Sequence, residues 1–280
     1  MPTFAVVSGR ATPTSARLGP VLSPAQAVAR LEPGDVALGR LDVLPSLDGI
    51  QPGLWALEVL ERRGVIVLNG RDALATAHDK LATAEALACA GIPHPPTEHV
   101  APWLPMPLLE SPLVLKPRFG SWGRDVTRCD DAEDVARATE AVRLRAWFDA
   151  TGAVAQRLVP PAGFDLRVVV AAGRVVGAVM RRAAPGEWRT NVALGAHRIP
   201  VTPPQEACEL ALAAAEAVGG DLVGIDLLPL PGNGWIVLEV NGAVEFNRAY
   251  SFETEIFSTV RKVLLERCSL EPVPLDYSVA

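Results

Sequence analysis

The residues best suited to hold a metal ion lie in a predicted β-hairpin, GIDLLPLPGNGWIVLEVNG. Two β-type runs flank a turn rich in glycine and proline, which is typical of an antiparallel hairpin. In a register symmetric about this turn, Asp226 faces Glu239. The same register pairs Leu227 with Leu238. We therefore expect the two carboxylates to lie opposite each other across the strand pair.

Asn241 adds a third oxygen-bearing group to these two carboxylates. Because side chains alternate along a strand, Asn241 shares a face with Glu239, while Leu238 points to the other side. Two directly opposed carboxylates destabilise a strand pair by up to about 1 kcal/mol, and a hard cation such as Mg²⁺ would relieve that repulsion. The pattern leaves a solvated sheet face open as the alternative.

A second feature is the segment LKPRFGSWGRDV, in which a predicted strand delivers Lys116 to a turn that contains glycines. Backbone amides at Gly120, Ser121 and Gly123 can cradle phosphate oxygens. The segment lacks the GxxxxGK[ST] order of a P-loop, and no GxGxxG follows the first predicted strand. Taken alone, the loop is more often an ordinary hairpin turn.

A third feature is a group of four arginines in and after two β-rich runs: Arg167, Arg181, Arg182 and Arg189. Arg167 lies in the apolar run FDLRVVVA, where a buried charge without an anionic partner would be very costly. A structural salt bridge would explain any one of them. Four arginines beside a carboxylate hairpin favour an anionic ligand, and the three features together describe a site for a polyphosphate with its metal ions.

Three units are expected to position these residues. Residues 3–67 alternate short apolar runs with helical stretches, as a small βαβ layer does. Residues 92–112 hold seven prolines and mark a boundary, after which a second unit carries the glycine loop and a helix over residues 131–150. A third unit opens with a strand over residues 153–159 and carries the arginines and the carboxylate hairpin.

Charge and cysteine usage argue against several partners. The net charge of −6 and pI near 5.3 disfavour nucleic acid, whose phosphates attract basic surfaces. The four cysteines form no CxxC pair, so the sequence indicates neither a zinc site nor a disulfide framework. We expect a cytoplasmic protein with no signal peptide, membrane span or membrane partner.

The chain resembles the ATP-grasp carboxylate–amine ligases, and within them the RimK and LysX branch. An ordered set of segments carries the resemblance, from about residue 77 to about residue 267: AHDKLATAEALACAGIPHPPT, LVLKPRFGSWGRDV, AQRLV, FDLRVVVAAGRVVGAVMRR, WRTN, GIDLL and LEVNG. The motifs are highly specific when they occur together in this order.

The resemblance implies a role for each motif. Phosphate lysines correspond to Lys80 and Lys116, beside the glycine loop of Gly120, Ser121 and Gly123. The residues that contact the nucleotide in this family correspond here to a hinge segment and one acidic residue: Gln156, Arg157, Leu158, Val159 and Asp165. The family's residues that contact phosphate or the acyl phosphate correspond to Arg167, Arg181, Arg189 and Asn191. Its Mg²⁺ ligands correspond to Asp226, Glu239 and Asn241. Two positions depart from the family pattern, Arg157 in the hinge and Ala196 after WRTN, which puts adenine binding and acceptor recognition in doubt.

The implied fold is α/β (α+β), with three parts that clamp ATP. A small N-terminal βαβ domain spans residues 1–78, and a central subdomain with the glycine loop spans residues 79–155. The C-terminal subdomain with the metal site spans residues 156–269, and residues 270–280 form a tail.

The implied activity is an ATP- and Mg²⁺-dependent ligation, with Mn²⁺ as an alternative ion. It joins a carboxylate to an amino-acid amine through an acyl phosphate and releases ADP. The carboxylate belongs to a small molecule, a peptide or a carrier protein, and homodimers or homotetramers are common in this branch. Two alternatives stay open: a ligase of small free amino acids or peptides, and a non-catalytic ATP-binding regulatory module.

Overall fold

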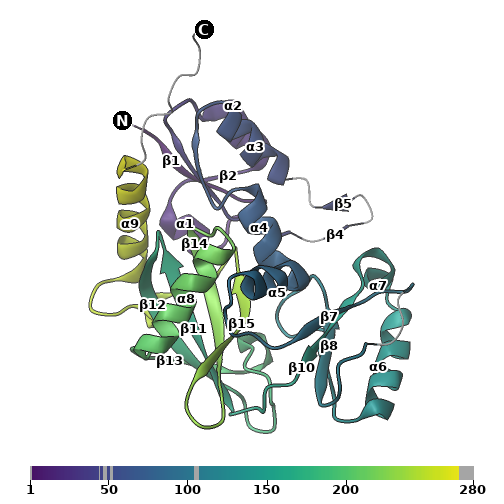
Figure 1. Ribbon diagram of the computed structural model, residues 1–280. Coiled ribbons are helices and arrows are strands. Elements are labelled where there is room, and N and C mark those ends of the chain that lie inside the picture. The colour runs from purple at the N-terminus through teal and green to yellow at the C-terminus, as the bar shows by residue number, and fades with distance from the viewer. Residues whose placement is uncertain (1, 44, 47–48, 51–52, 104–106, 271–280) are drawn as a thin grey trace.

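The chain folds around three main β-sheets (Figure 1), as seen in a computed structural model that describes residues 2–43, 45–46, 49–50, 53–103 and 107–270. The first sheet is parallel, in the order β2-β1-β3-β6, and confirms the expected βαβ layer. Its elements are β1 (Phe4–Val7), α1 (Pro13–Leu18), β2 (Val21–Leu22), α2 (Pro24–Arg30), β3 (Val36–Gly39), α3 (Leu54–Arg62), β6 (Ile66–Leu68) and α4 (Arg71–His78). A two-stranded ribbon, β4 (Pro45–Ser46) and β5 (Gly49–Ile50), follows β3.

The middle sheet is antiparallel, in the order β7-β10-β8-β9. Its elements follow α5 (Lys80–Cys89) and are β7 (Thr97–Val100), β8 (Leu113–Pro117), β9 (Thr127–Cys129), α6 (Ala132–Arg143), α7 (Ala146–Thr151) and β10 (Ala153–Arg157). Two expectations were wrong here. The helix expected over residues 131–150 is broken where Arg145 adopts an extended conformation, and β10, expected to open the third unit, pairs with β7 and β8.

The third sheet has the order β13-β12-β11-β14-β15, with every pair antiparallel. Its elements are β11 (Phe164–Ala171), β12 (Arg174–Arg182), β13 (His197–Pro200), α8 (Gln205–Ala217), β14 (Leu222–Pro229), β15 (Trp235–Asn241) and α9 (Ile256–Leu270). The expected tail at residues 271–280 lies outside the described residues. None of the described helices has the length and apolar character needed to cross a membrane.

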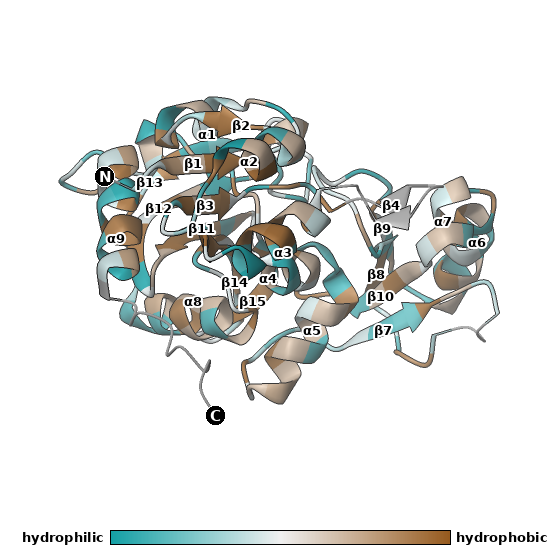
Figure 2. Ribbon diagram, turned by 90° about the horizontal axis from the view of Figure 1, so that it is seen from above, coloured by the Kyte–Doolittle hydropathy of each residue, from teal (hydrophilic) through white to brown (hydrophobic). Residues whose placement is uncertain are grey.

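Packing joins the first and third sheets and leaves the middle sheet apart. One core cluster combines Val6 and Leu38 of the first sheet with Val169 of the third sheet and Val260 of α9. The core of the middle sheet is formed only by residues between Val100 and Ala155. Figure 2 shows the middle sheet with α6 and α7 projecting from the body that the other two sheets form. A cleft between two such bodies is a natural place for a ligand.

Asn69 fastens the first sheet to the third. This fully buried side chain follows β6, donates from Nδ2 to the carbonyl of Leu222 at 2.7 Å, and accepts from the amides of Asp221 and Leu222 at 2.8 and 2.9 Å. It also donates to the carbonyl of Gly242 at 3.2 Å, just after β15. One side chain therefore holds β6, β14 and the end of β15 in fixed positions.

Replacing Asn69 with alanine is expected to lower the free energy of unfolding by about 3 kcal/mol, because buried backbone groups lose their partners. Asn233→Ala is the matched control, since both residues have a positive φ, 50° at Asn69 and 70° at Asn233, but Asn233 lies exposed in a turn. Urea denaturation measures both variants. Equal losses would show that backbone strain, not hydrogen bonding, explains the effect.

Candidate functional site

Two adjoining cavities open between the middle sheet and the other two sheets. The larger has a volume of about 1150 Å³ and the smaller about 140 Å³, and both are lined by Lys80, Gln156 and Glu239. Every residue to which the resemblance assigns a role lines at least one of them, whereas Arg182 lines neither. The fold thus brings these residues together, although they are spread over more than half of the chain.

The predicted hairpin of β14 and β15 places Asp226 directly opposite Glu239. Beyond this pair the register shifts by one residue, so that Leu227 faces Val237. The expected pairing of Leu227 with Leu238 was therefore wrong, because a β-bulge inserts Leu238 as an unpaired residue. The bulge turns Leu238 into the cavity beside Glu239, instead of to the opposite face.

Asp226 is buried and is held by two arginines. Arg167 donates to it from Nε and Nη2, both at 2.6 Å, and Arg181 donates from Nη2 at 2.9 Å. Burial opposes its ionisation, but the two guanidinium groups outweigh burial and hold the pKa of Asp226 below its ordinary value. Arg181 also binds Asp165, which accepts a further hydrogen bond from Thr190. The cavity floor is thus a chain of alternating charges.

Glu239 and Asn241 present oxygen atoms to the same cavity. The amide oxygen of Asn241 lies 3.1 Å from Oε1 of Glu239, so that two acceptors face each other. Rotating the amide would turn this contact into a hydrogen bond. In that orientation the amide oxygen also accepts from Nη2 of Arg167 at 3.3 Å. In either orientation Glu239 and Asn241 line the cavity, and oxygen atoms are the ligands that Mg²⁺ prefers. Oδ1 of Asp226 accepts a single hydrogen bond and retains a lone pair for the same ion.

These three residues differ from a typical transition-metal centre. No group of three or more His, Cys, Asp or Glu side chains suited to a metal occurs among the residues that the structure describes. A donor set of two carboxylates and one amide, all oxygen ligands, suits a hard cation.

Lys116, at the end of β8, is buried, and its Nζ donates to Oε1 of Gln156 at 2.8 Å. Burial lowers its pKa to about 8, with the charge of Glu239 acting in the opposite direction. Its ammonium has a single hydrogen-bond partner within the described part of the chain, so it retains donors for an anion in the cavity.

Lys80 begins α5, and its Nζ donates to the carbonyl of Gly120 at 2.6 Å. Asp79 caps this helix and receives a two-pronged interaction from Arg118, with distances of 2.6 to 3.0 Å. This ion pair, which the sequence analysis missed, ties the start of α5 to the strand that carries Lys116. The positions of Lys80 and Lys116 relative to each other are therefore fixed.

The glycine loop follows β8 and packs against the loop before β13. Its backbone takes positive φ at Gly123 (70°), where a Cβ would approach Oδ1 of Asn191 to 2.7 Å. Arg189 donates to the carbonyl of Gly123 at 2.9 Å and is held by Glu187, whose pKa these hydrogen bonds lower to about 2. Arg189 thus lies at the loop, away from the pair Arg167 and Arg181, and Arg182 is exposed.

The hinge segment after β10 lines the smaller cavity. Its first amides are occupied, because Arg157 donates to the carbonyl of Pro96 at 2.9 Å and Leu158 donates to that of Pro112 at 3.0 Å. Apolar side chains of Val114, Leu228 and Leu238 line the same space. These residues also escaped the sequence analysis, because apolar positions in strands are ordinarily core residues.

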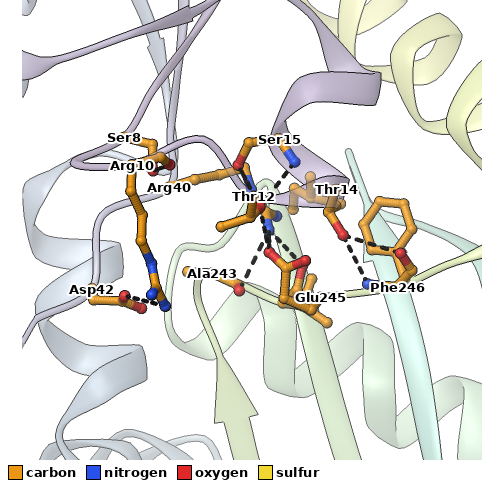
Figure 3. A network of polar contacts seen from close by, with 12 residues as sticks. Ser8, Arg10, Thr12, Thr14, Ser15, Arg40, Asp42, Ala243, Glu245 and Phe246 are labelled. Carbon is orange, nitrogen blue, oxygen red and sulfur yellow. Dashed lines mark hydrogen bonds and ion pairs between the residues drawn. The ribbon is translucent and has the colours of Figure 1, made fainter.

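The larger cavity continues to the first sheet, where Arg40 anchors a polar network (Figure 3). This buried arginine donates from Nη2 to the carbonyl of Val244 at 2.7 Å and to Glu245 at 2.9 Å, while Thr12 donates to the same carboxylate at 2.7 Å. Arg10 and Asp42 lie 3.9 Å apart on the same wall. This wall carries side chains of positive and negative charge, whereas Lys80 and Lys116 bring positive charge to the other side of the site.

Known proteins resemble this chain in sequence. Residues 77–261 match the family model described as a RimK-like ATP-grasp domain. The glutamate–LysW ligase ArgX of Sulfurisphaera tokodaii is 31% identical over 221 residues, which cover 76% of this chain and 78% of that protein.

Solved structures share the fold across nearly the whole chain. D-alanine–D-alanine ligase from Bacillus anthracis complexed with ATP has a TM-score of 0.67 at 15% identity, covering 96% of this chain and 98% of that one. The ATP-grasp ligase PsnB complexed with a minimal precursor, Mg and ADP has a TM-score of 0.64 at 16% identity, covering 95% and 98%. With a family model matched over about two thirds of its length, the chain belongs to the RimK-like ATP-grasp family.

Proposed function

We propose that this protein is an ATP-dependent carboxylate–amine ligase that forms an amide through an acyl phosphate and releases ADP. The observation that carries the proposal is the convergence of Lys80, Lys116, the arginine pair and the oxygen ligands of β14 and β15 on one cavity. Phosphoryl transfer needs positioning and charge neutralisation more than a protein nucleophile. The site provides both.

The smaller cavity is proposed to take the adenine. Leu228 and Leu238 offer apolar faces, and Val159 supplies the next backbone amide after the two that Pro96 and Pro112 occupy. The triphosphate would then extend toward Lys116 and Lys80.

Glu239, Asn241 and Asp226 are proposed to hold Mg²⁺, or Mn²⁺ in its place. A divalent ion bound there would neutralise charge on the phosphates. Arg167 and Arg181, fixed by Asp226 and Asp165, orient guanidinium groups toward the transferring phosphoryl group and the acyl phosphate. Because these arginines are already positioned by buried carboxylates, little reorganisation accompanies the reaction.

The carboxylate and amine are proposed to enter the part of the larger cavity near the first sheet. The relatives differ in substrate: their names specify a glutamate and LysW, two D-alanines, and a peptide precursor. The wall of Arg10, Asp42 and Glu245 offers charges of both signs, which suits an amino acid better than a polyanion. We therefore favour an amino acid as one of the two substrates.

The test of the function is mass spectrometry of reactions that contain ATP, Mg²⁺ and pooled amino acids and peptides. We expect a new amide mass and equimolar ADP. Glu239→Gln is expected to reduce product at least about 100-fold, because one cation ligand is lost. Its thermal unfolding should change little, since the Glu239 carboxylate forms no ion pair among the described residues. Nucleotide binding without any product would instead support the regulatory module.

ATP affinity, measured by calorimetry without Mg²⁺, is expected to fall about tenfold between pH 7 and pH 9. Lys116 has a pKa of about 8, so it is charged and attracts phosphate below that pH, and it loses its proton above it. Lys116→Met should bind weakly at both pH values. Lys262→Met, which alters an exposed lysine, should keep the pH dependence. A pH-independent affinity in the unaltered protein would contradict a phosphate contact by Lys116.

The glycine loop is expected to act as a lid over ATP. Gly123→Ala should lower turnover at least tenfold, because the new Cβ is strained at positive φ and collides with Asn191. Gly173→Ala is a matched control, since Gly173 also has positive φ (70°) but no atom lies within 4 Å of its Cβ position, and it lines neither cavity. Equal losses of turnover and of thermal stability at Gly123 would identify the loop as a structural turn only.

A further inference from the structure

His78 is one of the residues that line the larger cavity. It is the last residue of α4, two positions before Lys80, and its side chain lines the cavity together with Glu239 and Asn241. The imidazole packs over the residue after Asn241: a Cβ built on Gly242 would lie 3.1 Å from Cε1 of His78. The ring is therefore close to the cation ligands and also borders the wall of the first sheet.

The hydrogen bonding of His78 fixes its tautomer. Nδ1 lies 2.8 Å from the carbonyl oxygen of Leu74. Because a carbonyl can only accept, Nδ1 must carry the hydrogen, and in the neutral ring Nε2 then carries the lone pair. Nε2 has no hydrogen-bond partner in the described part of the chain, so it is available to a ligand.

The charges around His78 favour the neutral ring. Burial lowers its pKa below the ordinary histidine value, and the positive charge of Lys80 acts in the same direction. The hydrogen bond to Leu74 and the charges of Asp42 and Glu239 oppose this shift but do not outweigh burial. His78 is thus able to accept a proton at neutral pH.

We propose that His78 is the general base that accepts a proton from the attacking amine; this inference rests on the proposed ligase function. An ammonium must become an amine before its nitrogen can attack the acyl phosphate. The nitrogen loses one proton before it attacks, and a second as the C–N bond forms and the C–O bond to the phosphoryl group breaks. One passes to Nε2 of His78 and the other leaves with the phosphate. His78 then returns its proton to solvent.

The position of His78 distinguishes it from the other groups that could do this. Asp226 is occupied by two arginines, and Glu239 faces the proposed cation. Lys80 and Lys116 are assigned to the phosphates. Asp42, Glu245 and His94 also line the larger cavity, but Asp42 and Glu245 are paired with Arg10 and Arg40. The ring of His78, by contrast, packs against Gly242, next to the proposed cation ligand Asn241.

The test compares two nucleophiles with the same pool of twenty amino acids, ATP and Mg²⁺. Hydroxylamine is largely unprotonated at neutral pH, so it traps an acyl phosphate as a hydroxamate without needing a base. We expect His78→Asn to reduce amide formation at least about 100-fold and hydroxamate formation less than about threefold. The rise of amide formation with pH, through a pKa below the ordinary histidine value, should disappear. His99→Asn is the control, because His99 also contacts a backbone carbonyl, at 3.2 Å, but lines neither cavity.

Other outcomes would overturn the proposal. Equal loss of amide and hydroxamate would show that His78 supports ATP binding or folding, and unchanged amide formation would show that it has no role. Absence of both products in the unaltered protein would instead refute the ligase function for this substrate pool. Nitrogen-15 NMR of the imidazole is then decisive without any substrate: a hydrogen on Nε2 of the neutral ring would exclude His78 as the base.

Discussion

The pairing of buried charges on three adjacent strands is the constraint on which the site depends. Arg167 of β11 lies opposite Asp226 of β14, and Asp165 of β11 lies opposite Arg181 of β12, each as a direct cross-strand partner. A buried ion without a partner costs several kcal/mol, so each strand register is fixed by charge as well as by apolar packing. A shift of the strand register by one residue would turn every side chain of that strand to the opposite face of the sheet and leave these charges unpaired. The floor of the cavity is therefore rigid because the sheet could not form in another register.

The other parts of the site are fastened to this floor by polar contacts that cross between sheets. Asn69 and Arg40 bind the first sheet to the segment around β15, and the ion pair of Asp79 and Arg118 binds α5 to β8. Each contact uses one or two side chains that are remote in sequence from their partners. The arrangement separates two tasks: the third sheet fixes the charges, and the contacts set how the first sheet and the lysines approach them.

The sequence predicts the parts of this site that depend on local pattern. The pairing of Asp226 with Glu239 follows from hairpin symmetry, and the βαβ layer follows from the alternation of apolar runs. The bulge at Leu238 was not predictable, because one extra residue leaves no mark in a short apolar run. The membership of β10 in the middle sheet depends on contacts with β7 and β8, which periodicity does not encode. The sequence alone does not single out His78, because a lone histidine has no informative spacing; only its hydrogen bond and its position in the cavity do so.

The separate core of the middle sheet has a consequence for the catalytic cycle. Because that core contains no residue of the other sheets, the middle sheet can swing outward as one body while all its own apolar contacts persist. The one apolar side chain of the glycine loop packed against the core of the first sheet is Phe119, which is only partly buried. Opening would therefore expose little nonpolar surface, and the contacts it would break are mostly polar, among them the ion pair of Asp79 with Arg118 and the hydrogen bond from Arg189 to Gly123. Release of a product would then need no unfolding of the middle sheet.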